Sequence, residues 1–223
     1  GTDVIKLSEK DLTDIRGKRV GMIFQEPSSY LNPVFTAGSQ VAEAIKNSLN
    51  HPGSSTLRKE DAGGVEVCIN RLERKKRVLK MLDDVGLKEN VYYQYPHQLS
   101  GGMQQRVMIA MALINSPDIL IADEPTTALD VTTADGILKL LKEMMKRYGL
   151  SLLFVTHDIS LAVGFTHRIA VMYAGKIVES GGAQETFNHP LHPYTEKLIS
   201  CLPERYKKGQ RIQVIEGQVP DFN

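Results

Sequence analysis

The sequence has 223 residues, 42% of them hydrophobic, so it can bury the core of one large domain or of one domain with a subdomain. Lysine and arginine number 27 against 26 acidic residues, which excludes the charge excess that points to nucleic acid or an anionic membrane. Its two cysteines, Cys68 and Cys201, are far apart, which favours inert thiols in a reducing compartment. No run approaches the roughly 18 to 20 apolar residues of a membrane span, and the first residues lack signal-peptide character. We therefore expect a soluble chain whose link to a membrane passes through partners.

The N-terminal part combines one buried strand with irregular segments. Residues 18–25 predict a short strand, and the proline-containing stretch 26–33 predicts a loop without regular structure. A helical pattern begins near Ala37. The polar stretch 50–70 and the basic run 71–77 indicate a solvated, mobile insertion in preference to a binding patch.

Strands and helices alternate along the rest of the chain. Apolar spacing predicts helices over 78–85 (with Gly86 as a stop), 103–114, 132–148 and 160–165. Buried strands are predicted over 119–122 and 150–156 and a further strand over 168–173, and 174–179 indicates a hairpin return. This alternation predicts an α/β fold with a mainly parallel sheet, in which ligands bind at the carboxyl ends of the strands.

The stretch Leu99-Ser100-Gly101-Gly102-Met103-Gln104-Gln105-Arg106 carries the most specific pattern. A serine and two glycines at a helix start offer unpaired backbone N–H groups, a hydroxyl and the positive end of the helix dipole. This pattern predicts a seat for a phosphate group. The alternative is an ordinary N-cap serine followed by a glycine turn.

Polar side chains also follow several predicted strands. Asp123 and Glu124 end one strand, where one carboxylate can hold Mg²⁺ and its neighbour can orient or deprotonate a water. The alternative is an acidic pair that caps the following helix. Gln25 follows another strand and can hold Mg²⁺ or the water. His157 follows a third, where it is either structural or a hydrogen-bond donor to a phosphate.

In these residues the chain resembles the ATP-binding cassette (ABC) ATPases. LSGGMQQR resembles their signature motif, ILIADE the Walker B strand, TALD the D-loop, THD the H-loop and FQEP the Q-loop, in the family's order. The resemblance implies an α/β, P-loop NTPase-like (RecA-like) core with a mainly parallel sheet and an inserted α-helical subdomain. It divides the chain into a partial core (1–34), the helical subdomain with the signature (35–115), the rest of the core (116–180) and a C-terminal extension (181–223).

The resemblance also implies ATP and Mg²⁺ as cofactors. Glu124 would be the general base, His157 would hold the γ-phosphate, Gln25 would contact the metal and the water, and Asp123 would bind Mg²⁺. In this family the signature loop serves ATP held by the opposite subunit, and residues there and in the D-loop would face that nucleotide: Ser100, Gly101, Gly102, Gln104 and Asp130. Catalysis would then require a second ATPase subunit, identical or not.

The sequence contains no G-x-x-x-x-G-K-[ST] phosphate-binding loop. Gly17-Lys18 is followed by Arg19 and Gly175-Lys176 by Ile177. Residues 1–4 resemble the hairpin that follows this loop's helix in the family, so we expect an N-terminally truncated chain. On its own such a chain would bind ATP poorly and hydrolyse none.

Two stretches resemble the dipeptide, oligopeptide and nickel importer branch, namely 26–33 and 188–195. His189 and His192 in the second stretch are interpreted as parts of a proline-stiffened turn in preference to metal ligands. The branch implies a peripheral subunit at the cytoplasmic face of the cell membrane, powering peptide import. Its partners would be permease subunits and, indirectly, an extracytoplasmic solute-binding protein, without nucleic acid.

Two other functions remain open at this point. A soluble ABC ATPase acting on DNA or ribosomes is one, although the stretch from Gln25 to Ser100 is too short for the long coiled coil of the DNA-maintenance members. An inactive fragment of the cassette is the other, against which the presence of Glu124 and His157 argues.

Overall fold

The computed structural model describes residues 3–46 and 71–202. The chain divides into two compact units, residues 1–155 and 156–223, and each is described by itself. The predicted boundaries after residues 34, 115 and 180 remain predictions. No helix in either described range has the length and apolar character of a membrane span.

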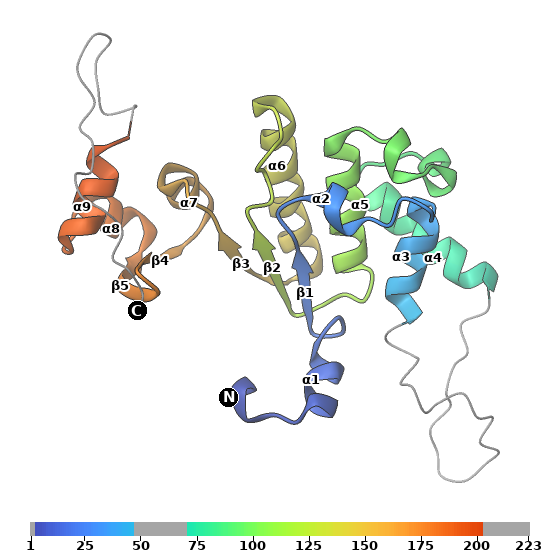
Figure 1. Cartoon of the computed structure of the whole chain (residues 1–223), viewed down its shortest axis with the longest axis horizontal. Helices are drawn as coiled ribbons and strands as arrows, with labels where there is room; N and C mark the ends of the chain where they lie inside the picture. Colours follow the sequence, from blue (N-terminus) through green and yellow to red (C-terminus); the bar gives the residue numbers. More distant parts are fainter. Residues whose placement is uncertain (1–2, 47–70, 203–223) are drawn as a thin grey trace. The chain divides into compact units, whose positions relative to one another are not determined.

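A three-stranded parallel sheet forms the centre of the first unit (Figure 1). Its order is β1 (Val20–Ile23), β2 (Ile119–Asp123) and β3 (Ser151–Val155). Ile23 pairs with Ala122, and Asp123 pairs with Val155. The predicted strands and the α/β class with a parallel sheet are therefore confirmed.

Helix α5 (Gly101–Leu113) covers one face of this sheet. A Cβ atom on Gly21 of β1 would lie 2.5 Å from the backbone oxygen of Ala112, so the glycine permits this close approach. On that face Leu120 and Ala122 are fully buried, whereas Ile119 on the other face is 42% exposed. The prediction of buried runs over 119–122 and 150–156 is thus wrong in part, because alternate side chains of a strand point to opposite faces. Ile119 and Ile121 of β2 are not buried, and in β3 Leu153 is 55% exposed and Val155 is 43% exposed.

Helices α3 (Ala37–Lys46) and α4 (Arg71–Asp84) pack against α5 beside the sheet, and the short helix η2 (Glu89–Tyr93) packs against α3 and α4 (Figure 1). Each of these three longer helices contributes a fully buried side chain: Val41 of α3, Val78 of α4 and Ile109 of α5. The further elements of this unit are η1 (Val4–Lys6), α1 (Glu9–Ile15), α2 (Pro27–Tyr30), η3 (Pro96–Gln98) and α6 (Val131–Tyr148).

Two predicted loops are wrong in part. The basic run 71–77 is the first half of α4, because arginine, lysine, leucine and glutamate are all strong helix formers. Within 26–33, Pro27 starts the single helical turn α2, since proline at the first helical position loses no backbone hydrogen bond. The rest of the predicted insertion, 50–70, lies outside the described residues.

Helix α3 approaches η2 so closely that Gly38 has no room for a side chain. A Cβ atom there would lie 2.3 Å from Tyr92 Cδ2 and 2.6 Å from the Tyr92 carbonyl oxygen. We expect Gly38→Ala to destabilise the chain by about 1–3 kcal/mol, as overpacked sites do. Urea unfolding measures this loss.

The matched control for Gly38→Ala is Gly164→Ala, in a helix position where a Cβ atom meets nothing within 4 Å. Alanine at that helical position should stabilise by roughly 0.5–1 kcal/mol. A gain of stability in both variants would contradict the close packing of Gly38 against Tyr92.

The ends of α4 and α6 are joined through Asp84, whose side chain is 5% exposed. Its carboxylate accepts a hydrogen bond from the Tyr148 hydroxyl over 2.7 Å and pairs with Arg147 Nη1 over 2.7 Å. Burial of the phenol and then the hydrogen bond to Asp84 raise the pKa of Tyr148 to about 12. The folded state therefore favours the protonated, uncharged form of the Tyr148 phenol.

We expect Tyr148→Phe to cost about 1 kcal/mol at neutral pH, because a partly exposed hydrogen bond to a charged group is lost. Since the folded-state pKa lies above the ordinary value, this contribution is complete below about pH 10 and is lost as the pH rises through about 12. Urea unfolding between pH 7 and 11 should show the gap between wild type and variant closing only at alkaline pH. A gap that closed on acidification would contradict this sign.

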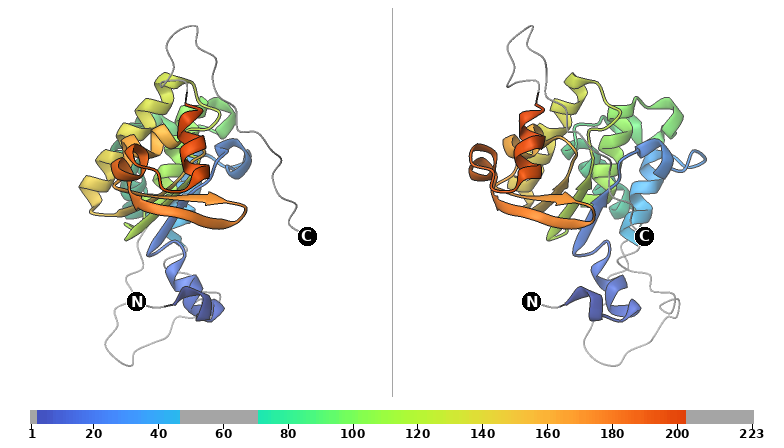
Figure 2. Two further views of the ribbon diagram at one scale, coloured as in Figure 1. Left: turned by 90° about the vertical axis from the view of Figure 1, so that its left-hand side faces the viewer. Right: turned by 60° about the vertical axis from the view of Figure 1, so that its left-hand side comes forward.

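The second unit is a β-hairpin packed with short helices (Figure 2). Strands β4 (Arg168–Tyr173) and β5 (Lys176–Gly182) pair antiparallel, which confirms the predicted hairpin return. The predicted strand 168–173 is thus β4, which pairs with β5 in a separate two-stranded sheet and not with the parallel strands. The helices of this unit are α7 (Ile159–Phe165), α8 (Ala183–Asn188) and α9 (Pro193–Ser200), and its buried core joins Ile159, Val163 and Ile199.

Candidate functional site

Two polar side chains meet where β1 and β2 end. Gln25 follows β1 closely, and Glu124 comes directly after β2. Gln25 Nε2 donates a hydrogen bond to Glu124 Oε2 over 2.9 Å. Parallel strands bring their carboxyl ends to one edge of a sheet, which is why the sequence predicted chemistry at both positions. The structure brings these two residues into direct contact.

The same carboxylate oxygen accepts a second hydrogen bond, from a residue that the sequence patterns did not single out. Thr127 Oγ1 donates to Glu124 Oε2 over 2.8 Å, and the Thr127 N–H donates to the Glu124 carbonyl over 3.1 Å. A threonine three residues after a carboxylate was the only sequence signal for this contact, and it is a weak one. Two donors on one oxygen hold the Glu124 carboxylate in a defined direction.

The backbone of Glu124 is also held in an unusual conformation. Its φ is 43°, in the left-handed region that non-glycine residues rarely adopt. Such a conformation costs on the order of 1–3 kcal/mol and persists only where the surroundings enforce it. Here the Glu124 N–H donates to the carbonyl of Val155 on β3 over 2.9 Å. Strain of this kind is common at functional sites, where it fixes a side chain in place.

Asp123 is the last residue of β2 and is half-buried beside this contact. Within residues 3–46 and 71–202, no group of three or more histidine, cysteine, aspartate or glutamate side chains could hold a metal ion. Mg²⁺ does not need such a group, because it is commonly held by one or two carboxylates with phosphate oxygens and water. The Asp123 carboxylate therefore fits Mg²⁺ bound together with a phosphate ligand, and a contact of Gln25 with the same ion stays a prediction.

Ser100 directly precedes helix α5. Its hydroxyl accepts a hydrogen bond from the Met103 N–H over 3.4 Å, so it is the N-cap that the alternative interpretation predicted. Ser100 and Gly101 are both exposed. The capping role does not exclude a ligand, because the hydroxyl proton and the other first-turn N–H groups can still be donated.

Gln104 points back from α5 into the preceding loop. Its Nε2 donates to the carbonyl of Pro96 over 2.8 Å and to that of Leu99 over 3.3 Å. In this arrangement Gln104 holds the loop that leads to Ser100. A direct contact between Gln104 and a nucleotide stays a prediction.

Asp130 is the N-cap of α6 and is exposed. Its Oδ2 accepts a hydrogen bond from Thr133 Oγ1 over 2.6 Å, and its Oδ1 accepts one from the Thr133 N–H over 3.0 Å. The hydroxyl hydrogen bond first, and then the backbone hydrogen bond, lower the pKa of Asp130. Asp130 is therefore charged at neutral pH.

His157 belongs to the second unit, where it is exposed and precedes α7. Its neighbour Asp158 caps this helix by accepting a hydrogen bond from the Leu161 N–H over 3.1 Å. Gln25 and Glu124 belong to the first unit, so the role of His157 beside them remains a prediction.

The two histidines near the C-terminal end of the described chain belong to a turn. Glu179 accepts hydrogen bonds from the N–H groups of Leu191 over 2.9 Å and His192 over 3.0 Å. His192 Nδ1 accepts one from the Tyr194 N–H over 3.1 Å and so caps α9. These contacts favour the proline-stiffened turn over a metal site.

Comparison with known families gives two matches along the chain. Residues 2–127 match the model described as ABC transporter. Residues 178–223 match the model described as oligopeptide/dipeptide transporter, C-terminal region. The chain belongs to the ABC transporter family, and the resemblance predicted from its motifs is confirmed.

Curated relatives carry peptide-transport names. The chain is 43% identical to the oligopeptide transport ATP-binding protein OppD of Bacillus subtilis, over 100% of this chain and 58% of the relative. It is also 43% identical to the dipeptide transport ATP-binding protein DppD of Escherichia coli, over 99% of this chain and 62% of the relative. The chain thus spans about three fifths of the length of these relatives.

Solved structures confirm the ABC ATPase fold. A dimeric structure of MJ0796, described as a bacterial ABC transporter cassette, superposes with a TM-score of 0.62 at 35% identity, over 81% of this chain and 69% of that one. CbiO1 of Clostridium perfringens, described as part of the ABC transporter complex cbiONQ, gives a TM-score of 0.63 at 28% identity, over 82% and 64% of the two chains. Another MJ0796 dimer is described as a post-hydrolysis state bound to ADP and Pi.

Proposed function

We propose that this chain belongs to the ATP-hydrolysing subunit of an ABC importer for peptides. The observation that carries the proposal is the hydrogen bond between Gln25 and Glu124 at the carboxyl edge of the sheet. The names of the OppD and DppD relatives support peptides as the transported solute.

Each predicted site residue has a chemical task in this proposal. Glu124 accepts the proton of the attacking water as general base, and its hydrogen bonds to Gln25 and Thr127 aim the carboxylate. Gln25 holds the water or Mg²⁺ through its side-chain oxygen. Asp123 would hold Mg²⁺, which would supply positive charge to the phosphates of ATP, and His157 would donate a hydrogen bond to the γ-phosphate.

A second copy of the cassette, identical or related, completes each nucleotide site. The start of α5, with the exposed Ser100 and Gly101 and the half-buried Gly102, offers N–H groups and a hydroxyl to the γ-phosphate of ATP bound by that second subunit. Gln104 supports this surface through its hydrogen bonds to the preceding loop. Asp130 at the start of α6 communicates across the same interface. The dimeric MJ0796 structures support this arrangement.

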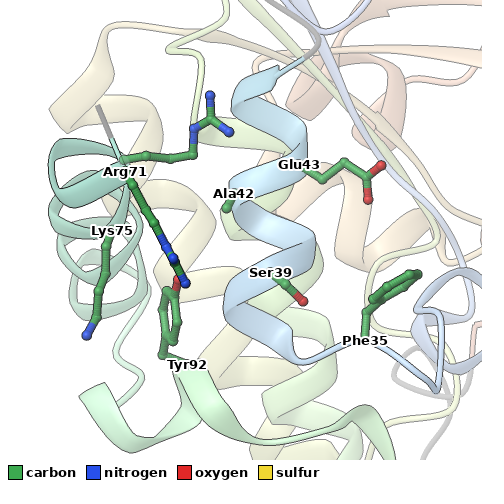
Figure 3. A pocket seen from close by; sticks show the side chains of 8 residues that line it. Phe35, Ser39, Ala42, Glu43, Arg71, Lys75 and Tyr92 are labelled. Atoms are coloured by element: carbon green, nitrogen blue, oxygen red, sulfur yellow. The ribbon is translucent and has the colours of Figure 1, made fainter. Parts of the chain in front are cut away.

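A surface hollow fits the proposed link to the membrane. A cavity of about 630 Å³ opens beside α3 and α4, and Figure 3 shows Arg71 and Lys75 of α4 on one side of α3 with Glu43 and Phe35 on the other. Its lining is Phe35, Ser39, Ala42, Glu43, Arg71, Arg74, Lys75 and Tyr92. Mixed charges around aromatic rings suit a short amphipathic helix from a permease subunit. The solute-binding protein would act only through that permease, from the other side of the membrane.

ATP hydrolysis by the whole protein, measured with and without its permease subunits in lipid vesicles, tests this function. We expect hydrolysis that rises several-fold when a peptide-loaded binding protein is added to the complete assembly. Hydrolysis at the same rate without the permease, and without response to peptide, would overturn the importer and favour a soluble ABC ATPase. No hydrolysis under any condition would favour an inactive cassette.

A further inference from the structure

The first turns of α5 and α6 lie against each other. A Cβ atom on Gly102 of α5 would lie 2.4 Å from the methyl carbon Cγ2 of Thr133 on α6. One turn further along, a Cβ atom on Gly136 of α6 would lie 3.6 Å from Arg106 Nη2 of α5. The two contacts show that the helices remain adjacent over successive turns, and that the Thr133 methyl fills the space left by the glycine.

The other branch of the Thr133 side chain turns to Asp130. The hydroxyl donates to Asp130 Oδ2 over 2.6 Å, while the backbone N–H donates to Asp130 Oδ1 over 3.0 Å. The hydroxyl hydrogen bond is the largest cause of the lowered pKa of Asp130. One threonine therefore contacts the glycine of the signature loop with its methyl and the D-loop carboxylate with its hydroxyl.

We propose that Thr133 is a positioning residue that couples the D-loop carboxylate of Asp130 to Gly102 of the signature loop within one subunit. Because threonine is stiff at χ1, its methyl and hydroxyl cannot move independently. A displacement of Asp130 at the subunit interface is thereby transmitted to the N–H groups at the start of α5. The catalytic consequence rests on the proposed function, whereas the contact itself does not.

The contact is tested first by thermal unfolding of the whole chain in a double-mutant cycle of Gly102→Ala with Thr133→Ser. Gly102→Ala should lower the unfolding midpoint by about 5 °C, as overpacking does in a chain of this size. Thr133→Ser removes Cγ2, so in that background the same change should cost about 2 °C or less. Equal losses in the two backgrounds would overturn the coupling.

Gly101→Ala serves as the matched control for this cycle. A Cβ atom on Gly101 would lie 3.5 Å from Leu129 Cδ2, an ordinary contact that does not involve Thr133. Its effect on the unfolding midpoint should be the same in the wild-type background and in the Thr133→Ser background. If the effect of Gly101→Ala differed between the two backgrounds as much as that of Gly102→Ala, the cycle would be detecting general strain in α5. That result would overturn the proposed contact between Gly102 and the Thr133 methyl.

The hydroxyl is tested by NMR titration of Asp130 in the same chain. Thr133→Val keeps the shape of the side chain but loses the hydroxyl, so the pKa of Asp130 should rise towards the ordinary carboxyl value. Thr133→Ser keeps the hydroxyl and should leave this pKa low. A low Asp130 pKa in Thr133→Val would overturn the hydroxyl half of the proposal.

The catalytic consequence is measured as ATP hydrolysis by the whole protein in its complete assembly. Thr133→Ser, which loses the methyl, and Thr133→Val, which loses the hydroxyl, should each lower kcat about fivefold, the equivalent of one methyl contact or hydrogen bond. The KM for ATP should change less than twofold in both variants. Unchanged kcat in both variants would overturn a positioning role. Absence of hydrolysis in the wild type would overturn the proposed function, while a coupled cycle and a shifted Asp130 pKa would still support the link through Thr133.

Discussion

Replacement of Glu124 by glutamine should lower kcat for ATP hydrolysis by about 10²- to 10⁴-fold, the usual contribution of a general base. Glutamine has nearly the same shape and can still accept the hydrogen bonds from Gln25 and Thr127, but it cannot take a proton from water. Binding of Mg·ATP by the whole protein should therefore persist while turnover stops. Steady-state hydrolysis and equilibrium nucleotide binding, measured on the same preparation, separate these two effects.

The control for Glu124→Gln is the same change at Glu143, an exposed residue of α6. Glu143→Gln should hydrolyse ATP at the wild-type rate. Turnover by Glu124→Gln within a few-fold of wild type would contradict the role of this carboxylate. Loss of nucleotide binding with normal folding would instead assign Glu124 to binding.

Replacement of Ser100 by alanine should lower kcat by about 10²-fold, as removal of one preorganised donor to a developing anion does in other enzymes. The hydroxyl caps α5 by accepting the Met103 N–H, and its own proton is the one proposed to reach the γ-phosphate across the interface. Alanine at a capping position also costs about 1 kcal/mol of stability. Hydrolysis must therefore be expressed per folded subunit, with unfolding measured alongside.

Ser8 provides a matched comparison, because its hydroxyl caps α1 by accepting the Asp11 N–H over 3.3 Å. Ser8→Ala loses the same kind of cap and should keep wild-type turnover. If Ser8→Ala and Ser100→Ala lowered stability alike and neither lowered kcat, Ser100 would be an N-cap alone. That outcome would remove the signature loop from the proposed nucleotide contact.

Most of the sheet was predictable because apolar runs of strand length, separated by helical periodicity, leave few alternatives to a parallel arrangement. The hairpin of β4 and β5 was predictable because Gly175 lies between two strand-like runs, and the structure shows that glycine at φ 73°, a value that glycine adopts readily in a turn. The positive φ of 50° at Ala174 was not predictable, because alanine rarely adopts it. The helical start of α4 was missed because the basic run 71–77 carries too few apolar residues to show periodicity. Its helical character depends on intrinsic propensity and on packing against α3 and η2.

Part of the candidate site was predictable for a topological reason. Gln25 and Glu124 were expected at the same edge because each follows a parallel strand, and their hydrogen bond agrees with that expectation. Thr127, Thr133 and the inward direction of Gln104 were missed. The Thr127 contact accompanies the left-handed backbone at Glu124, and the Thr133 contact depends on the close approach of α5 and α6. The contacts of Gln104 depend on the path of the segment before α5, and no residue pattern encodes any of these three features.

The most direct test of an ATP-powered peptide importer measures peptide uptake and ATP hydrolysis together, in lipid vesicles that contain the whole protein with its permease and binding-protein partners. Wild-type vesicles should accumulate labelled peptide only while ATP is hydrolysed, and Glu124→Gln should stop both processes together. Peptide uptake that continues in the Glu124→Gln vesicles, or hydrolysis that does not respond to peptide, would contradict the proposed function.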